Sequence, residues 1–282
     1  MNNVVDTNKL KEIQLEIFKC IIDICNKYNI CYFCFGGTAL GAVRHNGFIP
    51  WDDDIDIAMK RKDYERFIKI APNELPPYYF LQNYKTDLDF RLPFAKIRDS
   101  RTTFIETSGR NLNINHGVYI DLFILDGFPD SDRKAKRLYK LNKLTRGYCA
   151  KDDISNRSKK ANFLIFLSRF YFLFAKTHKV IKKFDEQCKK NDFDKCRRGI
   201  CFGSIYGLKD MWPTEWFNGV SKFKFEGIEV NLPIEYDKYL KQIYGDYMVL
   251  PPESKRIAHH YCDVVDFERP YTYYVKKGQK KT

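Results

Sequence analysis

The sequence lacks the paired Cys-x-x-Cys motifs typical of structural zinc sites, although it contains nine cysteines. Cys31 and Cys34 form one such spacing, but they lie in an apolar stretch that we expect to be a strand. Residues three apart on a strand face opposite sides, so a shared zinc ion is not expected. The other cysteines are scattered along the chain. Their number and spacing fit core thiols in a reducing cytosol better than a disulfide framework.

The sequence also lacks a signal-peptide pattern and an apolar run long enough to span a bilayer. Residues 1–11 are polar, without the charged and apolar regions of a secretory leader. The apolar stretch at residues 161–175, ANFLIFLSRFYFLFA, is only fifteen residues long and is interrupted by Arg169. We therefore expect a cytoplasmic protein, either free or peripheral at the inner face of the membrane.

Acidic residues are in deficit, with 36 Asp and Glu against 49 Lys and Arg, which gives a formal net charge of +13. Such a balance predicts anionic partners: nucleotides, phosphate polymers, nucleic acid or an anionic membrane surface. It does not choose among them. The length of 282 residues allows one large or two small domains with a sizeable core.

The most informative stretch is residues 35–59, FGGTALGAVRHNGFIPWDDDIDIAM. It follows an apolar strand at residues 30–35, and its two glycines permit a tight turn into a short helix over residues 38–44, capped by Thr38. Amide groups at a helix start favour a bound phosphate. The candidate phosphate-binding residues of this segment are Gly36, Gly37, Thr38, Arg44 and His45.

The acids that follow Trp51 belong to a predicted strand. On a strand, Asp54 and Asp56 share one face, while Ile55 and Ile57 share the other. Two carboxylates held this close resist ionisation unless a cation lies between them. Oxygen ligands of this kind suit Mg²⁺ or Mn²⁺. The pattern therefore predicts a metal site at Asp54 and Asp56.

Periodicity along the first half predicts an α/β or α+β fold with a mixed sheet. Helical spacing covers residues 7–28 and 62–71, the second helix being stopped by Pro72. Strands are expected at residues 78–84, 94–99 and 102–107. Lys96 and Arg98 share a face of the second of these strands, and two interpretations stay open: a solvent-facing basic pair, or a site for donor phosphates.

A second informative stretch is GVYIDLFILDGFP, residues 117–129. Its apolar run predicts a buried strand with Asp121 in the middle. A buried carboxylate needs compensation, either by a structural salt bridge or by a place in the same site as the Asp-x-Asp strand. Asp126, at the strand end, is expected to be a turn residue.

The region after residue 130 is rich in lysine. It predicts a charged helix at residues 131–146, a polar loop at 152–160 and a second helix at 161–175 with lysines on both sides. Two interpretations of this second helix stay open: a buried helix of a helical subdomain, or an interfacial helix with its lysines on anionic lipid. Farther on we expect a strand at 222–230 and a helix from Ile234.

The segment from Gly36 to Ile57 resembles, almost without interruption, the signature of the LicD family of nucleotidyltransferase-fold phosphotransferases. The resemblance spans about residues 26–260, with a gap across the lysine-rich helices, and ends at His259 and His260, for which ordinary packing is expected. It implies a nucleotidyltransferase-like mixed sheet flanked by helices, with a helical insertion. The expected division is a catalytic core at 1–130, the insertion at 131–200 and a C-terminal segment at 201–282 that packs on the core.

The resemblance further implies metal-dependent phosphoryl transfer, with Asp54, Asp56 and Asp121 as catalytic residues and ligands of one or two Mg²⁺ ions. The implied donor is CDP-choline, and the implied acceptor is a sugar hydroxyl of a cell-surface glycan or a lipid-linked precursor, such as lipopolysaccharide, teichoic acid or capsule. Donors of ribitol or glycerol phosphate stay open. Two interpretations stay open for four aromatic residues: a cage for a quaternary ammonium, or packing in the core. These residues are Trp212, Trp216, Tyr244 and Tyr247.

Two rival functions follow from the same residues. One is nucleotidyl transfer to RNA or a small acceptor. The other is a non-catalytic basic module that binds lipid or nucleic acid, which would leave the three converging acids unexplained. A nucleic-acid partner is not expected.

Overall fold

The computed structural model describes residues 6–150, 159–256 and 262–278, and its architecture is organised around one long strand, β6 (Val118–Phe128). Every residue of β6 is buried, as its nearly continuous apolar sequence requires. It pairs in parallel with β2 (Asp56–Lys60) and antiparallel with β4 (Ala95–Asp99). The fold is therefore a mixed sheet of the α+β class, which confirms the predicted fold class.

The remaining strands extend this sheet on both sides. The order is β1-β2-β6-β4-β3, with β7 paired to the far end of β6 and β8 paired to β7. The bounds of these outer strands are β1 (Phe33–Cys34), β3 (Tyr79–Gln82), β7 (Arg198–Ile200) and β8 (Met211–Pro213).

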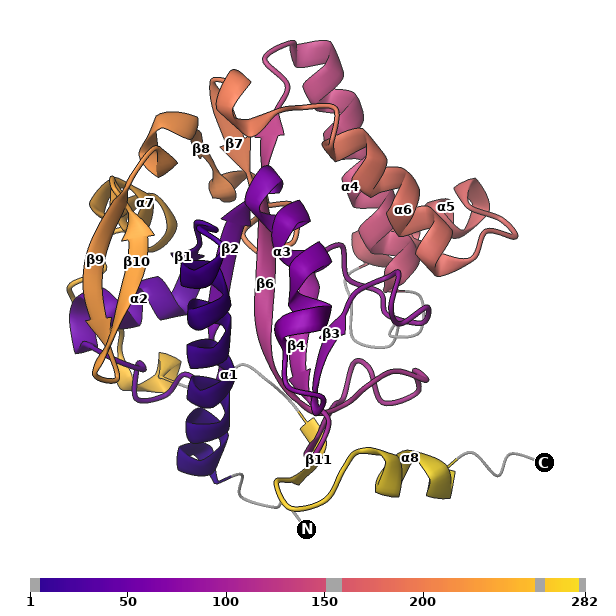
Figure 1. Ribbon diagram of the computed structural model, residues 1–282. Coiled ribbons are helices and arrows are strands. Elements are labelled where there is room, and N and C mark those ends of the chain that lie inside the picture. The colour runs from indigo at the N-terminus through magenta and orange to yellow at the C-terminus, as the bar shows by residue number, and fades with distance from the viewer. Residues whose placement is uncertain (1–5, 151–158, 257–261, 279–282) are drawn as a thin grey trace.

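Two helices, α1 (Thr7–Lys27) and α3 (Arg61–Glu74), lie against one face of the sheet (Figure 1). The apolar stripe of α1 is buried there, as its helical spacing predicts. Gln14 interrupts that stripe, and its Nε2 donates to the backbone oxygens of Asp53, at 3.0 Å, and Tyr119, at 3.4 Å. One buried amide thus joins α1 to the acidic loop and to the central strand.

Among the described residues of the predicted helical insertion, three α-helices pack beside the sheet (Figure 1): α4 (Asp132–Cys149), α5 (Lys159–Tyr171) and α6 (Thr177–Cys188). Arg61 joins this group to the core, because its guanidinium pairs with Asp126 of β6 at 2.7 Å and with Asp185 of α6 at 2.6 Å. Asp126 is therefore a buried strand residue, and its assignment to a turn was wrong. The sequence around it carries no sign of a partner 65 residues away.

The C-terminal part packs on both flanks of the sheet. Strands β9 (Val220–Phe225) and β10 (Ile228–Pro233) form a hairpin next to α2 (Gly36–His45) and β1, followed by α7 (Tyr236–Tyr244). At the other flank, β11 (Cys262–Asp266) pairs with β5 (Thr103–Glu106) and leads to α8 (Thr272–Gly278). Short 3₁₀ turns connect these elements: η1 (Phe193–Lys195), η2 (Gly207–Asp210), η3 (Thr214–Phe217) and η4 (Glu253–Lys255). The domain bounds stay a prediction.

Several predicted boundaries differ from the structure. The strand expected at 222–230 is a hairpin, because Glu226 and Gly227 both adopt positive φ angles, 47° and 78°, and reverse the chain. Helix α3 continues through Pro72, which lies in its last turn, where one missing hydrogen bond is tolerated. The strand β5 pairs with β11 in a separate two-stranded sheet.

Two expectations fall partly or wholly outside the described residues. Residues 152–158 of the polar loop expected at 152–160 lie outside them, and so do His259 and His260, for which ordinary packing was expected. Lys159 and Lys160 begin α5.

Candidate active site

Two of the predicted catalytic acids are direct neighbours in the sheet. Asp56 on β2 and Asp121 on β6 occupy the same register position of the parallel pair, and Lys96 on β4 occupies the matching position on the other side of Asp121. Side chains at one register position point to the same face. The sheet therefore sets Asp56, Asp121 and Lys96 in one row across three adjacent strands.

A cavity of about 850 Å³ lies over this row. We call it the carboxylate cavity, because Asp52, Asp54, Asp56 and Asp121 line it. Its other wall comes from the C-terminal part of the chain, including Tyr206 and Lys255. Its volume is in the usual range for a small-molecule site.

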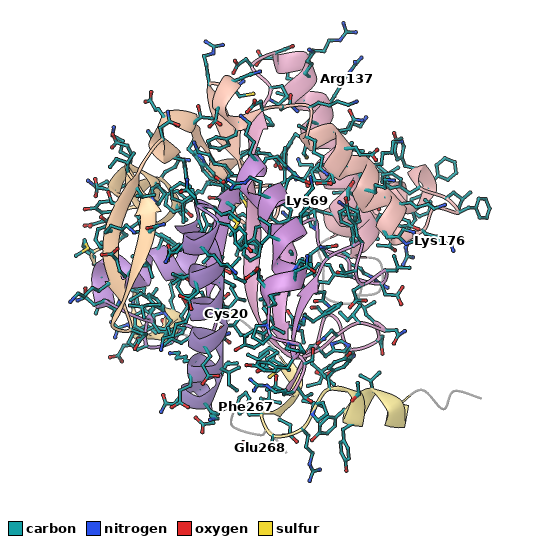
Figure 2. The ribbon with its side chains drawn as sticks, viewed as in Figure 1. Cys20, Lys69, Arg137, Lys176, Phe267 and Glu268 are labelled. Atoms are coloured by element: carbon teal, nitrogen blue, oxygen red, sulfur yellow. The ribbon has the colours of Figure 1, made fainter. Side chains whose placement is uncertain are left out.

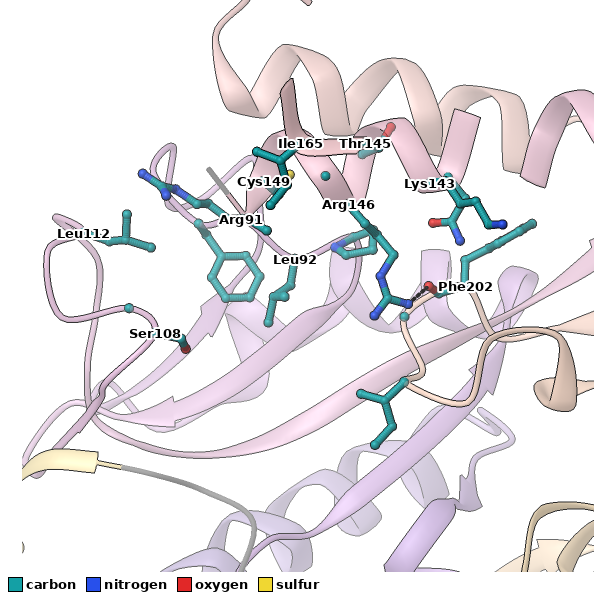
Figure 3. Close-up of a pocket in the computed structure, with 18 of the residues that line it drawn as sticks. Arg91, Leu92, Ser108, Leu112, Lys143, Thr145, Arg146, Cys149, Ile165 and Phe202 are labelled. Carbon is teal, nitrogen blue, oxygen red and sulfur yellow. Dashed lines mark hydrogen bonds between the residues drawn. The ribbon is translucent and has the colours of Figure 1, made fainter. Parts of the chain in front are cut away.

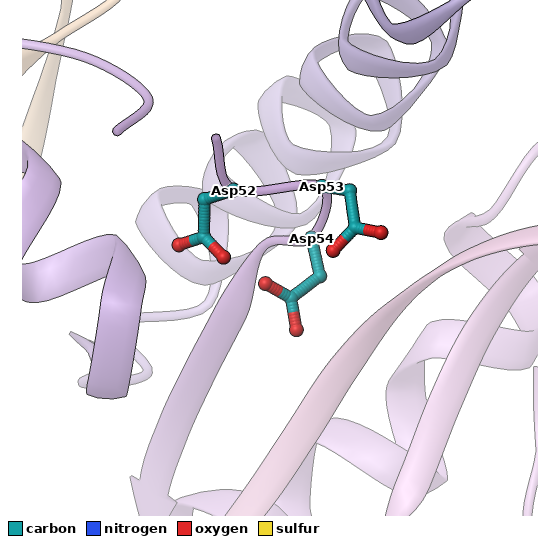
Figure 4. Close-up of side chains that lie close together, drawn as sticks. All are labelled: Asp52, Asp53 and Asp54. Carbon is teal, nitrogen blue, oxygen red and sulfur yellow. The ribbon is translucent and has the colours of Figure 1, made fainter. Parts of the chain in front are cut away.

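Asp54 reaches the carboxylate cavity from a loop and not from a strand. The strand β2 begins at Asp56, so Asp52, Asp53 and Asp54 belong to the preceding loop (Figure 4). One carboxylate oxygen from each of these three lies within 4.8 Å of the others. Asp53 is 7% exposed and is not among the residues that line the cavity. The loop thus adds further carboxylates next to Asp56 and Asp121.

The carboxylate of Asp56 is held in an unfavourable environment. Its Oδ1 is buried and has no hydrogen-bond partner among the described residues. Burial, followed by the charges of Asp54, Asp121 and Asp52, raises the pKa of Asp56 well above its ordinary value, and Lys96 offsets only part of this. Carboxylates that are crowded in this way ionise readily when a cation binds between them.

Lys96 also belongs to a buried group of charged residues next to Asp121. The Nζ of Lys96 is 3.2 Å from Asp121 Oδ1 and 3.3 Å from Glu106 Oε1, and it sits 3.3 Å from the centroid of the Tyr119 ring. Burial opposes ionisation of Glu106, yet Lys96 and Arg98 together lower the pKa of Glu106 to about 2. Lys96 and Arg98 therefore stabilise the ionised form of Glu106, and Lys96 also lies within ion-pair distance of Asp121.

Arg98 belongs to the same group and is 1% exposed. Its guanidinium donates to Gly117 O at 2.7 Å, to Gln82 Oε1 at 2.5 Å and to Glu106 Oε2 at 3.1 Å. Lys96 and Arg98 line a second cavity and not the carboxylate cavity. Their role toward donor phosphates stays a prediction, and the solvent-facing interpretation of the pair was wrong.

The two glycines lie directly beside the acids. Gly36 has a φ of +52°, and a Cβ at this position would be 3.2 Å from Asp56 Oδ2. A Cβ on Gly37 would collide with Asp52 Oδ2. At Gly36, glycine favours both the left-handed conformation and the close approach of the backbone to Asp56.

Thr38 has a different role from the predicted one. The helix α2 begins at Gly36, and its N-cap is Phe35, without a side-chain capping bond. The hydroxyl oxygen of Thr38 instead accepts a hydrogen bond from the backbone N–H of Asp56 at 2.8 Å. Thr38 therefore fixes the first turn of α2 to the first residue of β2.

Arg44 and His45 end α2, where Arg44 Nε donates to His45 Nδ1 at 3.4 Å, and only Arg44 faces the cavity. Arg44 lines the carboxylate cavity and donates to Tyr247 O at 2.6 Å. His45 packs edge-on against Trp51 and is absent from the lining of that cavity. Burial and the nearby charge of Arg44 lower the pKa of His45, which keeps the ring neutral near pH 7.

The four aromatic candidates also separate. Tyr244 and Tyr247 line the carboxylate cavity, whereas Trp212 is 1% exposed in the core and Trp216 packs against it. Sequence reasoning missed Tyr206 and Lys255, which complete the cavity wall but lie in segments without a motif. No local signal places these residues near Asp56, because only the packing of the C-terminal part brings them there.

A mixed sheet that sets carboxylates side by side, next to a Gly-Gly helix start, defines a nucleotidyltransferase-like domain. The sequence model of the LicD/FKTN/FKRP nucleotidyltransferase domain matches residues 29–124. The lipopolysaccharide cholinephosphotransferase LicD of Haemophilus influenzae is 34% identical over 242 residues, which cover 84% of this chain and 89% of that protein. An uncharacterized protein of Rickettsia prowazekii is 27% identical over 149 residues, about half of each chain.

These similarities settle the family. The chain belongs to the LicD family and is a transferase.

Proposed function

We propose that this chain transfers a phosphoryl-alcohol group, phosphocholine in the first place, from a CDP-linked donor to a sugar hydroxyl of a cell-surface glycan. The observation that carries the proposal is the pair of carboxylates at one register position, Asp56 and Asp121, beside the glycine turn of α2. The name of the Haemophilus relative supports phosphocholine as the group and lipopolysaccharide as the acceptor.

The acids fit a divalent cation. The buried Oδ1 of Asp56 has no hydrogen-bond partner among the described residues, and burial together with neighbouring acids raises the pKa of Asp56. Asp54, Asp56 and Asp121 offer only hard oxygen atoms, which suit Mg²⁺ or Mn²⁺. These three residues would hold the ion. A bound ion of this kind neutralises the negative charge of a diphosphate and of the developing transition state.

The residues of the chain bind the donor and position the reaction. The amides of Gly37 and Thr38 lie in the first turn of α2, ahead of the first intrahelical bond from Ala39 N to Phe35 O. Such amides favour a phosphate. Arg44 and Lys255 line the cavity and supply positive charge to it. These groups hold the diphosphate over the acid row.

The transfer itself is an in-line displacement. The acceptor hydroxyl attacks the phosphorus that carries choline, the bond from that phosphorus to the CMP oxygen breaks, and CMP leaves. Asp121 accepts the hydroxyl proton, and the Nζ of Lys96 lies 3.2 Å from Asp121 Oδ1. Tyr244, Tyr247 and Trp51 face the same cavity and offer aromatic surfaces to a quaternary ammonium.

The test is incubation with Mg²⁺, CDP-choline labelled in its methyl groups, and lipopolysaccharide. We expect CMP release in step with transfer of the label to the acceptor. CDP-ribitol and CDP-glycerol should compete weakly, since they forgo a cation–π contact of about 0.5–2 kcal/mol. If CDP-ribitol or CDP-glycerol proved the efficient donor, the transferred group would be ribitol phosphate or glycerol phosphate and not phosphocholine. Attachment of the nucleoside monophosphate to the acceptor would show nucleotidyl transfer instead.

We also propose that α5 binds the anionic inner face of the membrane. Its outer face and the turn after it expose large apolar side chains: Phe163 (62% exposed), Phe166 (64%), Phe170 (75%) and Phe174 (96%). Lys176, Lys179, Lys182 and Lys183 follow directly in the sequence and are exposed. Figure 2 shows Lys176 at the outer edge of the molecule, directed away from the sheet. None of the described helices is long and apolar enough to cross a membrane.

The membrane proposal is tested with vesicles of phosphatidylcholine, with and without phosphatidylglycerol. Each Lys near an anionic surface contributes about 1 kcal/mol, screened within about 8 Å at physiological salt. We expect Phe166→Ser with Phe170→Ser to weaken binding to the anionic vesicles at least tenfold. Leu88→Ser, at an exposed leucine outside α5, is the control. Unchanged binding by the double variant would contradict the proposal.

A further inference from the structure

A second cavity of about 560 Å³ lies between the helical insertion and the strands β4 and β5 (Figure 3). We call it the helix cavity, since α4 supplies much of its wall, including Asn142, Lys143 and Arg146. Lys96, Arg98 and Glu106 line it from β4 and β5. The transfer proposed above assigns this cavity no role.

The helix cavity adjoins the carboxylate cavity. Leu92, Arg146, Gly203 and Ile205 line both. Arg146 fixes this boundary, because its Nη1 donates to Ser204 O at 2.7 Å and to Phe202 O at 3.4 Å. Figure 3 shows the bond to Phe202. The two cavities therefore share part of one wall, which Arg146 holds in place.

Its lining combines apolar surface with positive charge. Phe90, Leu92, Phe202 and Ile165 supply aromatic and aliphatic surface, which suits the C–H faces of a sugar ring. Arg91, Lys143 and Arg146 are basic. Glu106 is the acid in the lining, and Lys96 and Arg98 already neutralise it. The balance of charge favours an anionic ligand.

Two residues of this wall, Asn142 and Thr145, carry a buried polar atom without a hydrogen-bond partner among the described residues. Asn142 is 5% exposed, and its Oδ1 is buried with no hydrogen-bond partner among the described residues. Leaving a buried acceptor unsatisfied costs about 1–3 kcal/mol. A side-chain amide offers both donors and an acceptor, which is the chemistry that recognises sugar hydroxyls.

We infer that the helix cavity binds the acceptor: a glycan segment that carries negative charge, with an adjacent sugar hydroxyl extended past Arg146 into the carboxylate cavity. This inference rests on the proposed transfer. It assigns the two substrates to two adjoining cavities, the donor over the acids and the acceptor against α4. The helical insertion is then the part of the chain that selects the glycan.

The test uses a matched pair of charge reversals on one helix. Lys143→Glu changes the lining of the helix cavity, whereas Lys140→Glu makes the same change at an exposed lysine outside both cavities. The probe is the phosphorylated core oligosaccharide released from lipopolysaccharide by mild acid, with a phosphatase-treated sample beside it. Binding to the donor-free protein is measured by calorimetry, and the KM values of acceptor and donor are measured by CMP release.

We expect Lys143→Glu to weaken binding of the phosphorylated oligosaccharide about tenfold and to raise the acceptor KM to the same extent. The donor KM should stay within twofold, and Lys140→Glu should match the wild type. The loss should be smaller with the phosphatase-treated sample. Asn142→Leu should weaken binding of both samples alike, since it removes hydrogen bonds and no charge.

The inference would be overturned if Lys143→Glu bound the phosphorylated oligosaccharide as tightly as the wild type. It would also be overturned if this variant raised the donor KM and left the acceptor KM unchanged, because the helix cavity would then bind the nucleotide. Failure of the transfer proposal gives a different result. In that case the wild type releases no CMP from any CDP-linked donor. Calorimetry then tests by itself whether the helix cavity binds the oligosaccharide.

Discussion

Replacing Arg61 tests how the helical insertion is attached to the core. The Nε and Nη2 atoms of Arg61 donate to the two oxygens of Asp126, at 2.7 and 2.8 Å, and Nη1 donates to Asp185 Oδ1 at 2.6 Å. Tyr84 donates to the other oxygen of Asp185 at 2.7 Å. All three charged groups are buried. One guanidinium therefore neutralises two carboxylates from different parts of the fold.

Arg61→Leu leaves both carboxylates buried without this partner. Breaking a buried ion pair by removal of one member destabilises a protein by about 3–5 kcal/mol. The total stability of a domain is about 5–15 kcal/mol, so the change is large. We expect it to appear as a lower urea midpoint at pH 7. Lys189, 3.0 Å from Asp185, limits the loss on that side.

The loss should depend on pH. In the wild type, burial raises the pKa of Asp126, whereas Arg61, Tyr84 and Lys189 outweigh burial and lower the pKa of Asp185. Without Arg61 the pKa of both carboxyls rises in the folded state. The folded protein then binds more protons than the unfolded chain, so its stability increases as the pH falls. The difference between variant and wild type should therefore shrink from pH 7 to pH 5.

Urea unfolding followed by tryptophan fluorescence at the two pH values measures both effects. Lys62→Leu is the control, because Lys62 is the next residue and pairs with Asp192 and Asp194 at the surface. Its midpoint should stay near the wild-type value. A loss below about 1 kcal/mol for Arg61→Leu, or a loss that grows at pH 5, would refute this account of the buried charges.

Three further changes have defined outcomes. Asp56→Asn should slow turnover by an amount equivalent to a loss of about 3 kcal/mol or more in transition-state stabilisation. The melting temperature of the metal-free protein should not fall. Full activity of this variant would contradict the metal site. Burial raises the pKa of Asp210 to about 7, so this carboxyl should contribute a loss of stability as the pH rises from about 4 to 7. Relative to the wild type, the urea midpoint of Asp210→Asn should therefore rise across this pH range. Phe172→Ser should destabilise the protein by about 3 kcal/mol, because Phe172 is 6% exposed and packs on Tyr148, whereas Phe170→Ser should barely change the melting temperature.

Features that depend on near neighbours in the chain were predictable. The stripe of α1 follows from apolar residues at helical spacing, and β6 follows from an apolar run bounded by turn residues. The same apolar run also placed Asp121 within β6. The concentration of acids after Trp51, next to two glycines, marks the candidate site through residue type and spacing.

The environment of a side chain was decided by residues far along the chain. Asp126 resembles a turn residue until Arg61 and Asp185 surround it. Phe170 and Phe172 are indistinguishable in the sequence, yet one is 75% exposed and the other 6%. The contact that buries Phe172 comes from Tyr148 of another helix.

The site itself divides in the same way. The sequence alone determined which acids and glycines are available, because these are properties of residue type and spacing. Tertiary structure decided that Asp56 faces Asp121, since strand pairing aligns residues 65 positions apart, and that the carboxylate cavity adjoins the helix cavity at Arg146. Local backbone preferences act over a few residues, whereas pairing and burial join segments whose distance in the chain carries no signal.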